Sequence, residues 1–399
     1  MVIQKRIVAA LAVLAAIAYR KRRSVPGLVV YVLCVALPRT VVLKLLAMIF
    51  PSQSNAALSR LDLLSAAFVA ATRWLLTGNI DDIVPTTRAF SKLDAFKARS
   101  LGATVVRHSE NSVNGIWVAE KQSDIPSTSA SGLTVAHKDA VVLLYIHGGG
   151  YFFNSAEFAA HHHFLLCKEF NAQKENTLRN IRLIVFSLEY DLAPHSPYPS
   201  QVFAAADTFK WLQDIGYQHI LVGGDSAGAH CTIALMNHIA KTPSLAGLSI
   251  QPSGAILFSP WVNPFINDCS SSKGTPIYDI LSLKSLKYGR DIVFSIMVSP
   301  SLENEVNFCK MTRDDLHLPQ SLVIYGGAEV LCEEIEEFVF ILKSQGKNYK
   351  DGIVEVHKFD GMPHDFNLIL GEPMFSAVYP HATNAIRITA DFIRRSTNK

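Results

Sequence analysis

Six short apolar runs in the last two thirds of the chain limit its fold more than any other feature. Helix-length segments separate these runs, and most of them are apolar at consecutive positions. Strands that are apolar on both faces belong to sheets covered by helices on both sides, and such sheets are mostly parallel. We therefore predict an α/β fold with a mostly parallel sheet flanked by helices, and with strands at residues 140–146, 182–188, 220–222, 255–258, 322–325 and 353–359.

Charge is divided unevenly along the chain. The first 60 residues contain nine Lys or Arg and no Asp or Glu, whereas the remainder contains 28 basic and 34 acidic residues. The part with the predicted sheet is thus net acidic and has no basic stripe, which argues against nucleic acid as a partner. With 49% hydrophobic and 18% charged residues, the chain is apolar enough for a large globular core.

Two apolar stretches occupy the basic N-terminal part. Residues 7–19 form a run of thirteen with basic residues on both sides, and residues 25–50 form a second stretch broken by prolines. The first run is short for a membrane span and also fits a signal-peptide core, while the second also fits helices packed over the core. Two such stretches together favour retention at a membrane, so we predict that residues 1–50 are an anchor or interfacial helices.

The rest of the chain divides into two predicted parts. Residues 52–99 have helical apolar spacing and no strand alternation, so we predict a helical cap or approach segment over 51–135. Residues 136–399 are predicted to form the catalytic domain, because they contain all six apolar runs. An insertion around 262–315 separates two of these runs and is expected to contribute to the same cap.

The strongest local motif is Gly224-Asp225-Ser226-Ala227-Gly228, which follows one apolar run and precedes a helical stretch. In a G-x-S-x-G motif, the serine lies on a sharp turn between a strand and a helix, and the glycines allow close approach of the backbone. The helix N-terminus beyond the turn favours developing negative charge. Ser226 is therefore the predicted nucleophile, supported by Gly224, Asp225 and Gly228.

A glycine-rich segment, His147-Gly148-Gly149-Gly150, follows the run at 140–146. Its N–H groups can converge on one oxygen, so we predict an oxyanion hole formed by Gly148, Gly149 and Ala227. His147 and Gly150 are predicted to support the loop, His147 by hydrogen bonding. A phosphate-binding loop is the weaker interpretation, because no Lys-Ser or Lys-Thr pair follows and the dinucleotide spacing is missing.

The acid and the base of such a hydrolase follow the serine in that order along the chain. Glu329 lies just after the run at 322–325, at the carboxyl end of a predicted strand, where active-site groups of open α/β sheets collect. His364 lies in a turn-rich loop after the run at 353–359. We predict Glu329 as the acid and His364 as the general base, with Glu333 or Glu334 as alternatives for the acid.

No metal or cofactor is expected. The six cysteines lack C-x-x-C pairs and are interpreted as buried thiols. His161, His162 and His163 are consecutive, so on a helix they point in three directions rather than toward one ion.

These motifs resemble those of the hormone-sensitive-lipase-like branch of the α/β-hydrolases, whose members share an HGGG loop, a GDSAG elbow and a tyrosine-leucine-alanine-proline segment. Here that segment is residues 189–194, and the resemblance covers about residues 141–366. With its basic, apolar N-terminus, the chain is similar to the fungal steryl acetyl hydrolases and, less closely, to the endoplasmic-reticulum arylacetamide deacetylases. The resemblance implies an α/β-hydrolase fold with a helical cap. It also implies a serine esterase that deacetylates a hydrophobic acetyl ester, such as a sterol acetate, at the endoplasmic reticulum membrane.

The chain departs from this branch at three positions. The branch usually has arginine where Asp191 stands, an acidic residue where His195 stands, and aspartate where Glu329 stands. Either carboxylate can orient an imidazole, so Glu329 fits the role. Two other functions stay open, namely an amidase or lactonase of the same mechanism and a non-catalytic ligand receptor on the same fold.

Overall fold

The computed structural model describes residues 61–110, 112–128, 134–135, 140–172, 181–242, 251–266, 279–294, 300–344 and 354–397. Residues 1–50, which are predicted to associate with a membrane, lie outside these ranges. Within the described ranges, none of the helices combines the length and the apolar composition that crossing a membrane requires.

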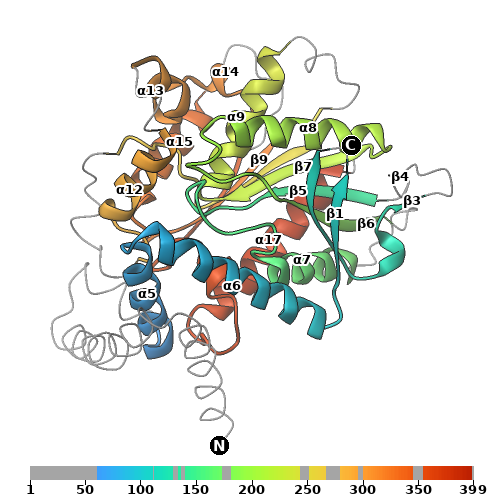
Figure 1. The fold of residues 1–399 in the computed structure, drawn as a ribbon, viewed down its shortest axis with the longest axis horizontal. Helices are drawn as coiled ribbons and strands as arrows, with labels where there is room; N and C mark the ends of the chain where they lie inside the picture. The colour runs from blue at the N-terminus through green and yellow to red at the C-terminus, as the bar shows by residue number, and fades with distance from the viewer. Residues whose placement is uncertain are drawn as a thin grey trace, which may run out of the picture.

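An eight-stranded sheet forms the centre of the fold (Figure 1). The strand order is β1-β2-β6-β5-β7-β8-β9-β10, and only the pairs β1–β2 and β2–β6 are antiparallel. The prediction of a mostly parallel sheet is therefore confirmed. The strands are β1 (Thr104–Glu110), β2 (Val113–Ala119), β5 (Ala140–Ile146), β6 (Arg182–Leu188), β7 (His219–Asp225), β8 (Gly254–Phe258), β9 (Ser321–Gly326) and β10 (Val354–Phe359); β3 (Ser127–Thr128) and β4 (Thr134–Val135) form a separate small pair.

Helices cover both faces of the sheet, which explains the continuous apolar runs. Every residue of β5, β8 and β9 is buried, so side chains on both faces of these strands are apolar or small. One face is covered by α8 (Ser200–Asp214), α9 (Ala227–Lys241) and α15 (Cys332–Lys343). The other face is covered by α7 (Ala160–Ala172) and α17 (Tyr379–Thr397), with α6 (Ile80–Ser100) packed outside α7 (Figure 1).

The segment predicted as helical over 51–135 contains part of the sheet. Helices α5 (Leu63–Leu76) and α6 account for its middle, but β1 and β2 form a hairpin that pairs with β6. The sequence of β1 is TVVRHSE, and its residues are half-buried or exposed. β1 lies at the edge of the sheet and none of its residues is fully buried, so it lacks the continuous apolar run that marks β5, β8 and β9.

The two segments predicted to form the cap contact each other. Arg73 of α5 donates a hydrogen bond to the main-chain oxygen of Asp279, in the insertion, at 3.1 Å. The N–H of Ile80, at the start of α6, donates to the Tyr288 hydroxyl at 3.2 Å. The described part of the insertion contains α12 (Leu283–Phe294), α13 (Pro300–Val306) and α14 (Arg313–Leu316).

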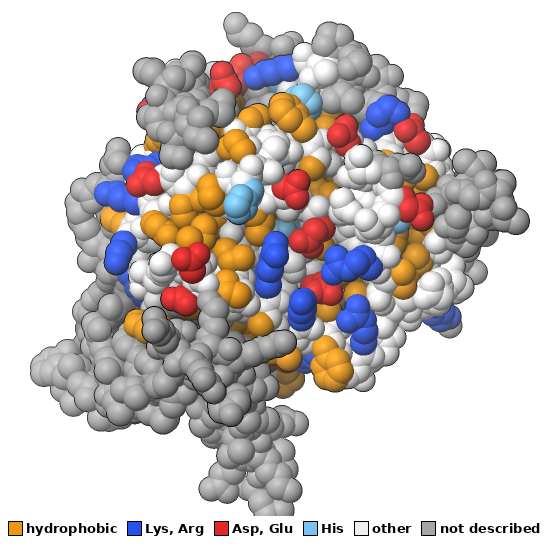
Figure 2. Space-filling model, viewed as in Figure 1, with side chains coloured by type: hydrophobic (Ala, Val, Ile, Leu, Met, Phe, Trp, Pro, Cys, Tyr) orange, Lys and Arg blue, Asp and Glu red, His pale blue; other side chains and the backbone are white. Residues whose placement is uncertain are grey.

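The molecular surface carries mixed charge. On the face shown in Figure 2, Lys and Arg side chains are interspersed with Asp and Glu rather than gathered into one field. Ion pairs among the described residues include Lys210–Asp214 at 2.6 Å and Arg182–Glu120 at 3.3 Å. The absence of nucleic acid among the partners stays a prediction.

Candidate active site

Ser226 lies at the turn between β7 and α9, where the motif predicts the nucleophile. Its φ of 51° and ψ of −116° are strained for a residue with a side chain. Three main-chain hydrogen bonds hold it: its N–H donates to Phe258 at 2.9 Å, and its carbonyl accepts from Trp261 and from His230, each at 3.1 Å. Helix α9 begins at the next residue, so the serine stands before a helix N-terminus. This is the geometry of a nucleophile elbow.

The two motif glycines are needed because the start of α9 packs against the end of β5. A Cβ atom on Gly228 or on Gly224 would collide with the carbonyl oxygen of Ile146. Both contacts are with backbone, which cannot move aside as a flexible side chain can. Gly224 and Gly228 therefore permit the close approach that their place in the motif predicts.

The glycine-rich loop corrects one predicted oxyanion donor. The N–H of Gly148 donates to Oδ1 of Asp225 at 2.9 Å, so it is not free to bind a substrate oxygen. The next two residues, Gly149 and Gly150, have φ values of 106° and 57°, and they turn the loop after Gly148. Their N–H groups and that of Ala227 donate to no described residue. Gly149, Gly150 and Ala227 thus form the donor set that the structure supports.

His147 and Tyr190 brace this loop, as expected for His147. The Tyr190 hydroxyl donates to the main-chain oxygen of His147 at 2.7 Å, and the two rings stack with centroids 4.1 Å apart. Nδ1 of His147 lies 2.7 Å from the Gly148 carbonyl, to which it donates. Burial lowers the pKa of His147 to about 4, so its ring is neutral and structural.

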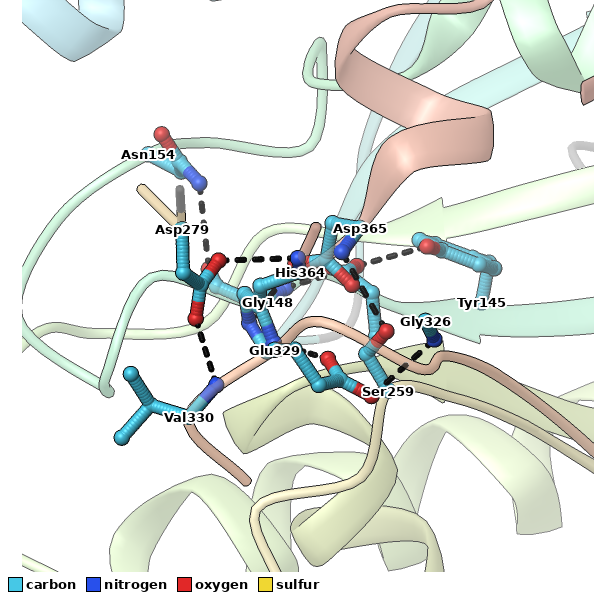
Figure 3. Close-up of polar contacts among 11 residues, drawn as sticks. Tyr145, Gly148, Asn154, Ser259, Asp279, Gly326, Glu329, Val330, His364 and Asp365 are labelled. Atoms are coloured by element: carbon cyan, nitrogen blue, oxygen red, sulfur yellow. Dashed lines mark hydrogen bonds and ion pairs between the residues drawn. The ribbon is translucent and has the colours of Figure 1, made fainter. Parts of the chain in front are cut away.

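Glu329 and His364, the predicted acid and base, lie together in the structure as a hydrogen-bonded pair. Oε2 of Glu329 lies 2.8 Å from Nδ1 of His364, while Oε1 accepts a hydrogen bond from the N–H of Gly326 at 3.2 Å (Figure 3). Both side chains are buried. The alternatives Glu333 and Glu334 lie on α15, beyond the loop that holds Glu329.

Nε2 of His364 contacts a second carboxylate in this structure. It lies 3.1 Å from Oδ2 of Asp365, and no hydrogen bond joins it to Ser226 among the described contacts. Catalytic hydrogen bonds of this kind often tighten only when substrate binds. Burial by itself would lower the pKa of His364, but Asp365 and Glu329 outweigh it and hold the pKa well above its ordinary value.

Asp225 joins the elbow to its surroundings through a buried carboxylate. Its Oδ1 accepts hydrogen bonds from the Tyr145 hydroxyl at 2.6 Å and from Gly148. Burial and the nearby Asp365 carboxylate raise its pKa to about 8, despite these two donors. The predicted supporting role of Asp225 is therefore to fix the oxyanion loop against the elbow.

Sequence reasoning missed two further acidic residues at the site. Asp365 follows His364 directly, and its N–H donates to the Ser259 hydroxyl at 3.2 Å. Asp279, from the insertion, accepts hydrogen bonds from the main chain beside Glu329 and from His364 (Figure 3). The position of Asp365 next to the predicted base His364 is a signal that could have identified it. Nothing in the sequence distinguishes Asp279 from the other acidic residues.

The three consecutive histidines, His161, His162 and His163, are predicted not to bind a metal ion together. They lie on α7, where His162 packs edge-on against Phe258 and His163 against Tyr145. Within the described ranges, no three His, Cys, Asp or Glu side chains are grouped to hold an ion.

Residues 143–368, more than half of the chain, match the sequence pattern of the alpha/beta hydrolase fold family. The chain belongs to this family. The stretch that matches runs from within β5 to α16 (Phe366–Ile369), so it contains every residue of the α/β-hydrolase site described above.

Two relatives and one solved structure illustrate the similarity. An esterase of Acinetobacter venetianus is 26% identical over 253 residues, which cover 63% of this chain and 74% of the esterase. The arylacetamide deacetylase of Oryctolagus cuniculus is 29% identical over 111 residues, which cover 26% of each chain. A hormone-sensitive lipase from a metagenome library shares the fold, with a TM-score of 0.60 and 20% identity over 83% of this chain and 98% of the lipase.

The prediction of an enzyme is confirmed at the level of reaction class. Family membership and the esterase relative agree that this α/β-hydrolase is a carboxylic ester hydrolase. The local geometry agrees as well, because an elbow serine, a Glu–His pair and free backbone donors are the parts that acyl transfer requires. The choice of substrate is a separate question.

Proposed function

We propose that this α/β-hydrolase removes acetyl groups from hydrophobic esters through Ser226, and that a sterol acetate is its first candidate substrate. The observation that carries the proposal is the Glu329–His364 contact of 2.8 Å, together with the strained elbow backbone of Ser226. Glu329 fixes the imidazole through Nδ1, which leaves Nε2 as the atom that can take the serine proton.

The reaction follows from these positions. His364 accepts the proton as Ser226 attacks the acetyl carbonyl, and the developing oxyanion binds the N–H groups of Gly149, Gly150 and Ala227. His364 then gives its proton to the departing alcohol. Water, activated by the same imidazole, cleaves the acetyl-serine and restores the enzyme.

Aromatic side chains support a hydrophobic substrate. The main-chain N–H of Trp261 donates a hydrogen bond to the Ser226 carbonyl. The centroid of the Trp261 ring lies 6.4 Å from that of the Phe294 ring. Phe152 follows the oxyanion loop, and its ring lies 6.1 Å from that of Tyr288 on α12. Both rings therefore lie near aromatic residues of α12, one of the helices of the insertion. The name of the rabbit relative, an arylacetamide deacetylase, supports an acetyl group as the acyl part.

The serine assignment is tested with a fluorophosphonate probe and a soluble acetyl ester. We expect Ser226→Ala to lose labelling and to lower kcat by about four to six orders of magnitude. Ser187→Ala is the matched control, because Ser187 is also buried, on β6, and its hydroxyl has no hydrogen-bond partner among the described residues. Near-normal turnover by Ser226→Ala would refute the mechanism, and a wild-type protein that is not labelled would favour a receptor.

The substrate is tested with matched pairs. Hydrolysis of a sterol acetate should exceed that of the corresponding butyrate, and an aryl acetate should be cleaved faster than the matching acetanilide. Faster cleavage of the anilide would make the protein an amidase. Equal rates on all esters would remove the preference for acetyl groups.

A membrane location, at the endoplasmic reticulum, completes the proposal. It is supported by the basic, apolar sequence of residues 1–50 and by the low water solubility of sterol esters. Such substrates partition into bilayers, so an enzyme retained there meets them at high local concentration.

A further inference from the structure

Asp279 connects the insertion to both catalytic loops. Its side chain is completely buried. Oδ1 accepts a hydrogen bond from the N–H of His364 at 2.9 Å, and Oδ2 accepts one from the N–H of Val330 at 2.7 Å. Figure 3 shows the two oxygens pointing to these two main-chain groups, which belong to different loops.

The two donors flank the catalytic pair. Val330 directly follows Glu329, and the other N–H belongs to His364 itself. A shift of either loop relative to the other would lengthen at least one of the two bonds. Because a carboxylate forms stronger hydrogen bonds than a neutral acceptor, and because neither N–H is exposed, such a shift is costly.

We propose that Asp279 is a positioning residue. It sets the separation of the loops that carry Glu329 and His364 and so keeps these two side chains within hydrogen-bonding distance of each other. The proposal rests on the proposed function, because it assigns a role within the same reaction. It adds that the insertion is part of the catalytic machinery as well as part of the cap.

Arg73 extends the connection to the N-terminal helices. Its guanidinium, on α5, donates hydrogen bonds to the main-chain oxygens of Asp279 and Leu281. The backbone that carries Asp279 is therefore fixed from outside by α5 and from inside by the catalytic loops. A displacement of α5 would therefore be transmitted to His364 through two hydrogen bonds, one between Arg73 and the main chain of Asp279 and one between the Asp279 carboxylate and the N–H of His364. Neither bond involves the substrate.

Asp279 also contributes charge next to the imidazole. The other acidic groups that face His364 are Glu329 after β9, Asp365 at the start of α16 and Asp225 at the end of β7. Arg73 faces Asp279 from the opposite side. Each carboxylate favours the imidazolium, so neutralising Asp279 lowers the pKa of His364. The imidazole must be neutral to accept the serine proton. The acid limb of the pH–activity profile, where activity is lost as the pH falls, therefore moves to lower pH.

The test compares Asp279→Asn with Asp94→Asn. Asp94 is a matched control, because its carboxylate also accepts a main-chain N–H, that of His161 at 2.9 Å, but at the start of α7. With a soluble acetyl ester, we expect Asp279→Asn to lower kcat about 10- to 100-fold with little change in KM, as for a small misplacement of reacting groups. The acid limb should move to lower pH. Asp94→Asn should change neither kcat nor the acid limb, whatever its effect on the melting temperature.

Three outcomes decide the proposal. An Asp279→Asn enzyme with normal kcat and an unmoved acid limb overturns it, and so does an equal loss of kcat in Asp94→Asn. If Asp279→Asn does not fold, Arg73→Gln replaces it and should lower kcat in the same direction with KM unchanged; a normal kcat again overturns the proposal. Activity that survives Ser226→Ala would instead overturn the proposed function itself.

Discussion

Asp365 places a second carboxylate on the catalytic imidazole, 3.1 Å from Nε2. It has a left-handed backbone with φ of 52°, which asparagine also tolerates, so Asp365→Asn keeps the shape and removes the charge. The pKa of His364 is raised in the folded protein, so activity is lost as the pH falls through that raised value. We expect Asp365→Asn to move the acid limb of kcat/KM to lower pH by about one unit. The control Asp360→Asn, an exposed residue of the same loop, should leave the limb in place; an unmoved limb in both variants would contradict the prediction.

Single residues were predictable where a motif and a strand end coincide. Ser226 and Glu329 follow buried strands and His364 follows the last strand of the sheet, so their order along the chain was enough to place them. The donor at Gly148 was misassigned, because a glycine motif does not show which N–H faces the substrate and which faces Asp225. Asp279 was not predictable, since its partner Val330 lies 51 residues away and the contact exists only after folding.

At the scale of elements, the junction of β5 and α9 is the tightest point around the site. A Cβ atom on Gly228 would meet the Ile146 carbonyl, whereas one on Gly254 of β8 would meet the movable rings and methyl groups of Phe392 and Leu221 at 3.2–3.3 Å. We expect Gly228→Ala to lower the free energy of unfolding by about 3 kcal/mol or more and Gly254→Ala by about 1 kcal/mol. Urea unfolding of both variants measures the difference. Equal losses would show that α9 can move away from the sheet.

Strands could be predicted most readily where burial on both faces makes them continuous apolar runs. All six predicted runs are strands of the sheet. Helices on both faces demand apolar side chains on both sides of the five inner ones, β5 to β9, whereas β10 lies at the edge and is mostly half-buried. The hairpin of β1 and β2 was placed in a helical segment instead. Its outer strand lies at the edge, where exposed Arg107 and Ser109 alternate with half-buried residues and dilute the apolar signal.

At the scale of the whole molecule, Asp62 joins helix α5 to the C-terminal part of the chain. Its side chain accepts a hydrogen bond from the N–H of Ser65 at 2.8 Å and thereby caps α5. The same carboxylate accepts the N–H of Ala377 at 2.9 Å, which joins the start of α5 to the segment before α17. Leu61, next to it, is buried. Helix α5 therefore has an N-cap and a contact with the C-terminal part of the chain that do not depend on residues 1–50.

These contacts allow the membrane part of the proposed function to be tested separately from the chemistry. Removal of residues 1–50 leaves Leu61, Asp62 and their partners in place, so the truncated protein should keep its kcat on a soluble acetyl ester within about twofold. It should no longer sediment with membranes, and its rate on a sterol acetate held in lipid vesicles should fall, because the enzyme no longer resides where that substrate does. Sedimentation of both proteins would assign membrane binding to the hydrolase body. If the full chain stayed in the supernatant as well, the membrane location would be withdrawn, while the serine mechanism would stand.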